Sequence, residues 1–133
     1  MPGSLVLVDT TIWIEHFRTR EFALSPLLVR LREQGHACIC GVILAELLQG
    51  SRSGKDSDLA NSLTGTCRML PDSIATWKGA GELAAALRRK GLTIGLIDCF
   101  LAVLAVEYHA EVLSLDGHFK DIAKHFPLEL TRP

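Results

Sequence analysis

The sequence predicts an α/β fold in which short strands and helices alternate along the chain. Unbroken apolar runs such as Leu5–Val8 are typical of strands buried on both faces, which occur in parallel sheets. Apolar residues at helical spacing follow directly, as at Trp13, Ile14 and Phe17. Helical crossovers between parallel strands cover both faces of a sheet. We therefore expect three layers, with a central parallel sheet of four to five strands and helices on both faces.

Five short apolar runs are expected to form the strands. They are residues 5–8, 37–40, 67–70, 112–115 and 128–130. Cys38 and Cys40 alternate in the second run, so both should face one side as small buried hydrophobic residues. The four cysteines form no Cys-x-x-Cys pair and have no histidine at zinc spacing, which argues against a disulfide or zinc role.

Capping residues and glycines predict the helix boundaries of the first half. A helix should begin directly after the first strand, and Ser25 should cap the next one, with Pro26 at its first position. Gly35 is the expected stop. A helix over 42–48 follows the second strand. The polar segment 51–58 is predicted to be a loop, before a short helix at 59–63.

The second half is predicted to hold the longest helices. Asp72 or Ser73 should cap a helix that finishes at 88–91. Its expected inner face consists of Ile74, Trp77, Gly81, Ala84 and Leu87. The helix over 94–108 is the most hydrophobic segment, and a short helix over 119–125 precedes the last strand.

The composition indicates one folded domain, residues 1–133, since hydrophobic residues make up 48% of the chain. The longest apolar run, Cys99–Val106, is far too short to cross a membrane, and no secretory signal opens the chain, so we expect a cytoplasmic protein. The net charge of -1 argues against nucleic-acid binding by bulk positive charge. It does not exclude a metal-assisted enzyme that acts on nucleic acid.

Acidic residues are expected to meet at one edge of the predicted sheet. Asp9 ends the first strand and Asp116 follows the fourth. Glu46 lies in the second turn of the helix that leaves the second strand, and Asp98 lies in the first turn of a helix that runs antiparallel to the strands. In open α/β sheets, ligands bind outside the carboxyl ends of the strands. The topology therefore brings four carboxylates that are distant in sequence to a single rim.

Each acid also has an ordinary structural explanation. Asp9 could cap the helix that follows it, Asp98 could favour a helix amino end, and Asp116 could belong to a simple turn. Glu46 resists such an explanation best, because apolar residues surround it and its helix has no evident solvent-facing side. No lysine or arginine lies one helical turn from Glu46 or Asp98.

Several carboxylates at one rim require either raised pKa values or a cation. Two carboxylates ~4 Å apart repel by roughly 4 kcal/mol at an effective dielectric of about 20. A hard divalent ion with oxygen ligands suits an all-carboxylate site, and Mg²⁺ or Mn²⁺ suits it better than zinc. The acids therefore predict a metal site.

Four short motifs, in this order, make the chain resemble the PIN domain family, and in particular the VapC-type toxins of bacterial toxin–antitoxin pairs. The motifs are Val8-Asp9-Thr10-Thr11 with Trp13-Ile14, Ala45-Glu46-Leu47 with Gly50, Ile97-Asp98 leading into Leu101-Ala102, and Ser114-Leu115-Asp116 before Phe119. The likeness covers essentially the whole chain. It implies a PIN-like fold and a metal-dependent ribonuclease.

The resemblance also implies roles for individual residues. The residues that match the family's acidic quartet, and would be catalytic and hold Mg²⁺ or Mn²⁺, are Asp9, Glu46, Asp98 and Asp116. Many relatives carry a further acid where this chain has His118, which leaves open the number of metals and the role of the last acid. Thr10 and Ser114 are expected to support the site. Either Asp9 or Glu46 could accept the proton of the attacking water.

The resemblance further implies an RNA substrate cut to a 5′-phosphate and a 3′-hydroxyl, a VapB-type antitoxin whose tail blocks a groove beside the site, and a homodimer. Two other kinds of protein remain possible. A flavodoxin-like receiver with a Mg²⁺ site should carry a pair of adjacent acids after its first strand. In this chain Ser4 precedes that strand, and no pair of adjacent acids occurs there. A PIN fold that binds RNA without cutting it is the other alternative.

Overall fold

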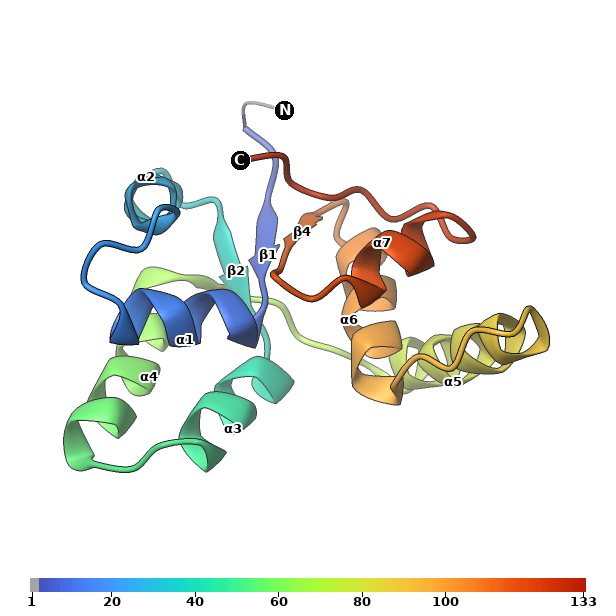
Figure 1. The fold of residues 1–133 in the computed structure, drawn as a ribbon, viewed down its shortest axis with the longest axis horizontal. Coiled ribbons are helices and arrows are strands. Elements are labelled where there is room, and N and C mark those ends of the chain that lie inside the picture. Colours follow the sequence, from blue (N-terminus) through green and yellow to red (C-terminus); the bar gives the residue numbers. More distant parts are fainter. Residues whose placement is uncertain (1–2) are drawn as a thin grey trace.

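The computed structural model describes residues 3–133, in which strands and helices alternate as predicted (Figure 1). The strands are β1 (Val6–Val8), β2 (Ala37–Ile39), β3 (Arg68–Met69) and β4 (Glu111–Leu113). The helices are α1 (Thr10–Arg18), α2 (Ser25–Glu33), α3 (Gly41–Gln49), α4 (Gly54–Thr66), α5 (Ile74–Arg89), α6 (Leu96–Glu107) and α7 (His118–Ala123). Within residues 3–133, no helix is both long and apolar enough to cross a lipid bilayer.

The strands form one parallel sheet in the order β3-β2-β1-β4. Leu7 of β1 is the centre of the register, paired with Cys38 on one side and Val112 on the other. Figure 1 shows the strands between two groups of helices, α1 to α4 and α5 to α7. The predicted three-layer α/β fold is therefore confirmed. The strand order reverses between β1 and β4, and crevices at such switch points bind ligands in open α/β sheets.

The core is built on the fully buried strand β1 and the helix that follows it. Trp13 of α1 is 0% exposed, and its Nε1 donates a hydrogen bond of 3.1 Å to the carbonyl oxygen of Val8. Its ring stacks on Phe17 with centroids 6.0 Å apart. The indole thereby fixes the start of α1 against the last residue of β1. Cys38 and Cys40 are also fully buried, as predicted.

The prediction of a fifth strand at residues 128–130 is wrong. Only Leu130 forms a parallel bridge, with Val112 of β4. The backbone nitrogen of Val112 donates to Glu129, and that of Thr131 donates to Val112. The segment therefore lies along the outer edge of β4 without continuing the sheet.

Two predicted helix starts are also wrong. Ser25 is the first residue of α2 and not its cap, because its hydroxyl bonds to Nδ1 of His16, 2.8 Å away. The predicted loop 51–58 is shorter, because Ser53 caps α4 by accepting the backbone N–H of Asp56 at 3.2 Å. Polar composition misled the prediction here, since α4 is a mostly exposed helix that buries only Ala60 and Leu63.

Helix α5 begins as predicted, with Ser73 and Thr76 forming a capping box, and its predicted inner face is partly right. Trp77, Ala84 and Leu87 pack against the core, and the ring of Trp77 stacks on Phe100 with centroids 4.1 Å apart. Ile74, in contrast, is 77% exposed. The buried residues are Thr76, Ala80, Leu83 and Leu87, so the most deeply buried side of α5 is rotated from the predicted one. Gly79, not Gly81, makes the close approach to α6, since a Cβ there would lie 3.1 Å from Cγ1 of Val103.

Candidate functional site

Asp9 lies at the carboxyl end of β1 and is buried, with 6% of its surface exposed. It occupies the N-cap position of α1, yet its side chain makes no capping hydrogen bond. Its Oδ2 instead accepts hydrogen bonds from Oγ1 of Thr11 at 2.9 Å and from Oγ of Ser114 at 2.7 Å. The capping explanation for Asp9 is therefore wrong. Two hydroxyls hold this carboxylate at the switch point of the sheet.

Asp98 and Asp116 approach the same place from α6 and from the turn after β4. Nδ1 of His118 lies 3.1 Å from Oδ2 of Asp98 and 3.4 Å from Oδ1 of Asp116. Burial raises the pKa of Asp98, the hydrogen bond with His118 opposes that rise, and the charges of Asp116 and Asp9 add to it. The structure thus brings three of the predicted acids within electrostatic reach of one another.

The turn after β4 is organised by side-chain hydrogen bonds. Oγ of Ser114 accepts the backbone N–H of Asp116 at 2.9 Å, and Oδ1 of Asp116 accepts the backbone N–H of His118 at 2.9 Å. The N–H of Leu115 donates to Oγ1 of Thr11 at 3.1 Å. Ser114 therefore bridges Asp9 and Asp116. Because Ser114 makes these contacts outside the sheet, β4 ends at Leu113 and not at the predicted residue 115.

Glu46 is linked to the site through Thr10. Oγ1 of Thr10 donates a hydrogen bond of 2.8 Å to Oε1 of Glu46, which is half-buried on α3. The argument that this helix has no solvent-facing side is wrong, since Ala45 and Leu48 are exposed. Glu46 nevertheless lies beside the residue that follows Asp9. It is not part of the tight group of possible ligand atoms formed by Asp98, Asp116 and His118, which lie within 4.8 Å of one another.

Thr11 contacts Asp9, a role that was not predicted from the sequence. Its hydroxyl donates to Asp9 and accepts from the backbone beyond β4, so it joins both sides of the switch point. Either Thr10 or Thr11 could have faced Asp9, because the choice depends on side-chain torsions in the first turn of α1. The signal in the sequence that could have identified Thr11 is a hydroxyl side chain two residues after an acid.

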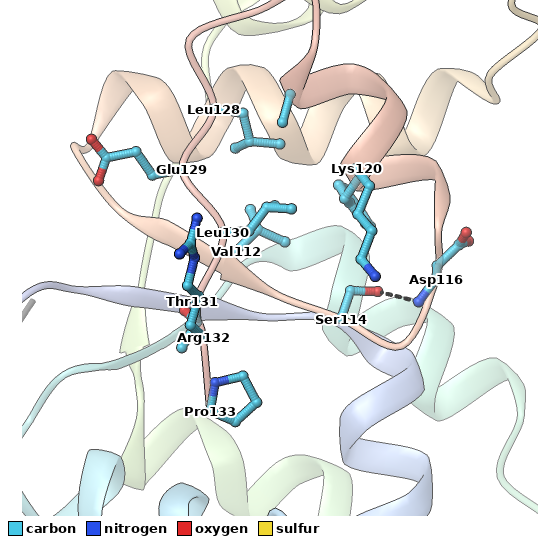
Figure 2. Close-up of a pocket in the computed structure, with 12 residues that line it drawn as sticks. Val112, Ser114, Asp116, Lys120, Leu128, Glu129, Leu130, Thr131, Arg132 and Pro133 are labelled. Atoms are coloured by element: carbon cyan, nitrogen blue, oxygen red, sulfur yellow. Dashed lines mark hydrogen bonds between the residues drawn. The ribbon is translucent and has the colours of Figure 1, made fainter.

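A pocket of about 730 Å³ opens beside Ser114 and Asp116. Figure 2 shows it between β4, the start of α7 and the C-terminal segment. Lys120 projects into it from α7, and Leu128 and Leu130 line the opposite side. One wall of the pocket is apolar, and the ammonium group of Lys120 provides a positive charge on the side of the acids. The pocket can therefore accept an anionic ligand close to Asp116.

The donor set fits a hard divalent cation. The side chains of Asp98 and Asp116 are 21% and 33% exposed, and Asp9 is buried. Among residues 3–133, no lysine or arginine forms an ion pair with any of them, so the negative charge has only His118 as a cationic partner. Carboxylate oxygens at such a place suit Mg²⁺ or Mn²⁺. Burial is the main cause of the raised pKa of Asp98, and the neighbouring charges of Asp116 and Asp9, which such an ion would balance, add to it.

The contacts of His118 predict a pH effect on the metal-free protein. Asp98, through its hydrogen bond, and Asp116 raise the pKa of His118 above its ordinary value of 6.5. The imidazolium thus stabilises the fold below that value, and the stabilisation is lost as pH rises through the raised pKa. The half-exposed ring should contribute less than about 1 kcal/mol. In EDTA, the Tm difference between wild type and His118→Gln should be about 1–3 °C larger near pH 6 than near pH 8. Equal differences would contradict this.

The chain was then compared with known proteins. It is similar to Ribonuclease VapC11 of Mycobacterium tuberculosis, with 28% identity over 124 residues, covering 90% of this chain and 92% of that one. Its fold is similar to VapBC2 from Rickettsia felis, solved bound to a DNA fragment from their promoter, with a TM-score of 0.80, 23% identity, and 96% and 97% of the two chains covered. For VapBC-1 from nontypeable Haemophilus influenzae, the TM-score is 0.75 and the identity 20%, covering 96% of both chains.

The family model of the PIN domain matches residues 6–125. This range begins at β1 and ends just after α7, so it contains the whole sheet and all the acids of the site. The resemblance noted from the four motifs is confirmed by this match. Because the match spans well over half of the sequence, the chain belongs to the PIN domain family.

Proposed function

We propose that this chain is a metal-dependent endoribonuclease, the toxin component of a VapC-type toxin–antitoxin pair. The observation that carries the proposal is the meeting of Asp9, Asp98 and Asp116 at the switch point of a PIN fold. The similarity to a VapC ribonuclease and to VapBC structures supports it. The alternative of a flavodoxin-like receiver is not favoured, because the family match is to PIN domains.

Each part of the site has a distinct role in this proposal. The residues that would hold Mg²⁺ or Mn²⁺ are Asp9, Glu46, Asp98 and Asp116. When bound there, such an ion would supply Lewis-acid polarisation of the phosphodiester and lower the pKa of a water ligand. Thr11 and Ser114 donate hydrogen bonds to Oδ2 of Asp9 and thereby fix the orientation of that carboxylate.

Glu46, like Asp9, is a candidate to accept the proton of the attacking water. Its Oε1 accepts one hydrogen bond, from Thr10, which orients the carboxylate. Within residues 3–133, no side chain donates a hydrogen bond to its Oε2, which is available for a proton. Lys120, in the pocket beside Asp116, is placed to contact a phosphate of the RNA. The products would be a 5′-phosphate and a 3′-hydroxyl.

The proposal includes partners. Beside Glu46, the side chains of Ile14, Phe17 and Leu47 line a hollow between α1, α3 and α4, with Arg18 at its margin. We propose that the tail of a VapB-type antitoxin covers this hollow and blocks access to the site. We further propose that residues 1–133 form one domain that pairs as a homodimer in the cytoplasm.

An RNA cleavage assay tests the proposed function. Purified protein should cut RNA with Mg²⁺ or Mn²⁺, and EDTA or Asp98→Asn should lower the rate by about 10²-fold or more, because the ion supplies several kcal/mol of transition-state stabilisation. Glu82→Gln, an exposed acid on α5, is the control for charge removal and should cut at the wild-type rate. Cleavage that survives both EDTA and Asp98→Asn would refute the proposal. RNA binding without cleavage would favour a catalytically idle PIN module.

A further inference from the structure

His118 brings a nitrogen donor to an otherwise all-oxygen group of possible ligands. Its Nδ1 lies within 4.8 Å of carboxylate oxygens of both Asp98 and Asp116, and within residues 3–133 these three residues form the one group of at least three possible metal ligands this close together. The imidazole approaches the carboxylates from the solvent side, since 51% of its side chain is exposed. Nothing in the catalytic proposal above uses this ring.

The distances fit adjacent positions around one octahedral ion. Ligand atoms about 2.1 Å from such an ion lie about 3 Å from their neighbours. Nδ1 of His118 lies 3.1 Å from Oδ2 of Asp98 and 3.4 Å from Oδ1 of Asp116, close to that separation. The backbone holds this arrangement, because the N–H of His118 donates to Oδ1 of Asp116 at 2.9 Å. An ion bound between the two carboxylates would therefore meet the ring nitrogen.

We propose that His118 is a nitrogen ligand of the metal ion held by Asp98 and Asp116, and that this ligand makes the site prefer Mn²⁺ to Mg²⁺. The inference rests on the proposed function only for the presence of a divalent ion. Mg²⁺ favours oxygen ligands and gives up water reluctantly, whereas imidazole suits transition-metal ions. To bind, the neutral ring offers the lone pair of Nδ1 and keeps its proton on Nε2.

The competing role for His118 is that of a hydrogen-bond donor that only orients Asp98. The two roles differ in whether the nitrogen touches the ion, so a method that detects directly bound nitrogen separates them. Pulsed EPR of Mn²⁺ detects the ¹⁴N nucleus of a directly coordinated imidazole. The competition between Mn²⁺ and Mg²⁺ for the same protein reports the preference without any need for RNA cleavage.

The test uses the full chain with Mn²⁺ below one equivalent. Wild type should show ¹⁴N coupling, His118→Asp should lose it, and His125→Asn, which removes an exposed imidazole just beyond α7, should keep it. The ratio of Mn²⁺ to Mg²⁺ affinity should fall by about tenfold or more in His118→Asp, as expected when a transition-metal ligand is replaced by an oxygen donor. His118→Gln, checked by Tm for folding, should also lose the coupling.

The outcomes separate this inference from the proposed nuclease. Absence of ¹⁴N coupling in wild type, or its persistence in His118→Asp, overturns the role of His118 even if RNA is cut. Coupling that depends on His118 in a protein that cuts no RNA supports the role and overturns the nuclease proposal. Failure to bind Mn²⁺ overturns the role of His118, and failure to bind either Mn²⁺ or Mg²⁺ overturns the nuclease proposal as well.

Discussion

Asp9→Asn is expected to reduce RNA cleavage by at least about 10³-fold and to leave the protein folded. Asp9 is the most buried acid of the site, and its position at the switch point of the sheet makes it the carboxylate that links Thr11, Ser114 and the neighbouring acids. Asparagine keeps an oxygen that can accept both hydroxyl hydrogen bonds. It removes the negative charge that the proposed metal site requires and that adds to the rise in the pKa of Asp98.

This substitution should therefore separate activity from stability. Single-turnover cleavage of RNA with Mn²⁺ measures the first, and the Tm in EDTA measures the second, which should equal or exceed that of wild type because carboxylate repulsion is relieved. The matched control is Glu82→Gln, which removes an exposed acid of α5. A variant of Asp9 that cuts RNA at more than about a tenth of the wild-type rate would exclude it as an essential ligand.

Trp13→Ala is expected to have the largest effect on stability, about 3–5 kcal/mol. The indole is fully buried, stacks on Phe17 and lies 5.8 Å from the guanidinium carbon of Arg32. Its hydrogen bond to the carbonyl oxygen of Val8 is also lost in alanine. Because this ring fixes the end of β1, the cavity left behind would also loosen the position of Asp9.

Thermal and urea unfolding measure the effect of Trp13→Ala, with a Tm lower by about 10–20 °C in a domain of this size. Trp13→Phe is the control, since it retains an aromatic ring and loses the indole N–H, and it should cost clearly less than alanine. A loss below about 1 kcal/mol for alanine would show that the cavity collapses and that β1 does not depend on this ring.

The layers and the position of the acids at one rim of the sheet could be predicted because both follow from the alternation of strands and helices along the chain. A strand such as Leu5–Val8 is buried on both faces and ends where polar residues begin, so Asp9 was placed correctly by the end of β1 alone. Glu46 was found by an argument that was only partly right. Glu46 lies at the rim of the sheet, beside Thr10, as the topology implies. The prediction also assumed that its helix has no solvent-facing side, and this is wrong, because Leu48 of α3 is exposed.

The errors fall where composition does not distinguish two structures. Helix α5 contains small apolar residues around much of its circumference, so its periodicity could not select the face that packs on α6. The start of α4 has the polar composition of a loop because that helix is mostly exposed. The contact of Thr11 with Asp9 depends on a rotamer, which no sequence pattern specifies.

The segment that pairs with Val112 also affects how the sheet meets other protein chains. An open sheet presents unpaired backbone groups at its two outer strands, and these are templates for aggregation by strand addition. Here the backbone N–H and carbonyl of Val112 are occupied by Glu129 and Thr131. At the opposite end, β3 is only the two residues Arg68–Met69. Within residues 3–133, neither margin of the sheet therefore offers a long free strand to which another chain could add by backbone pairing.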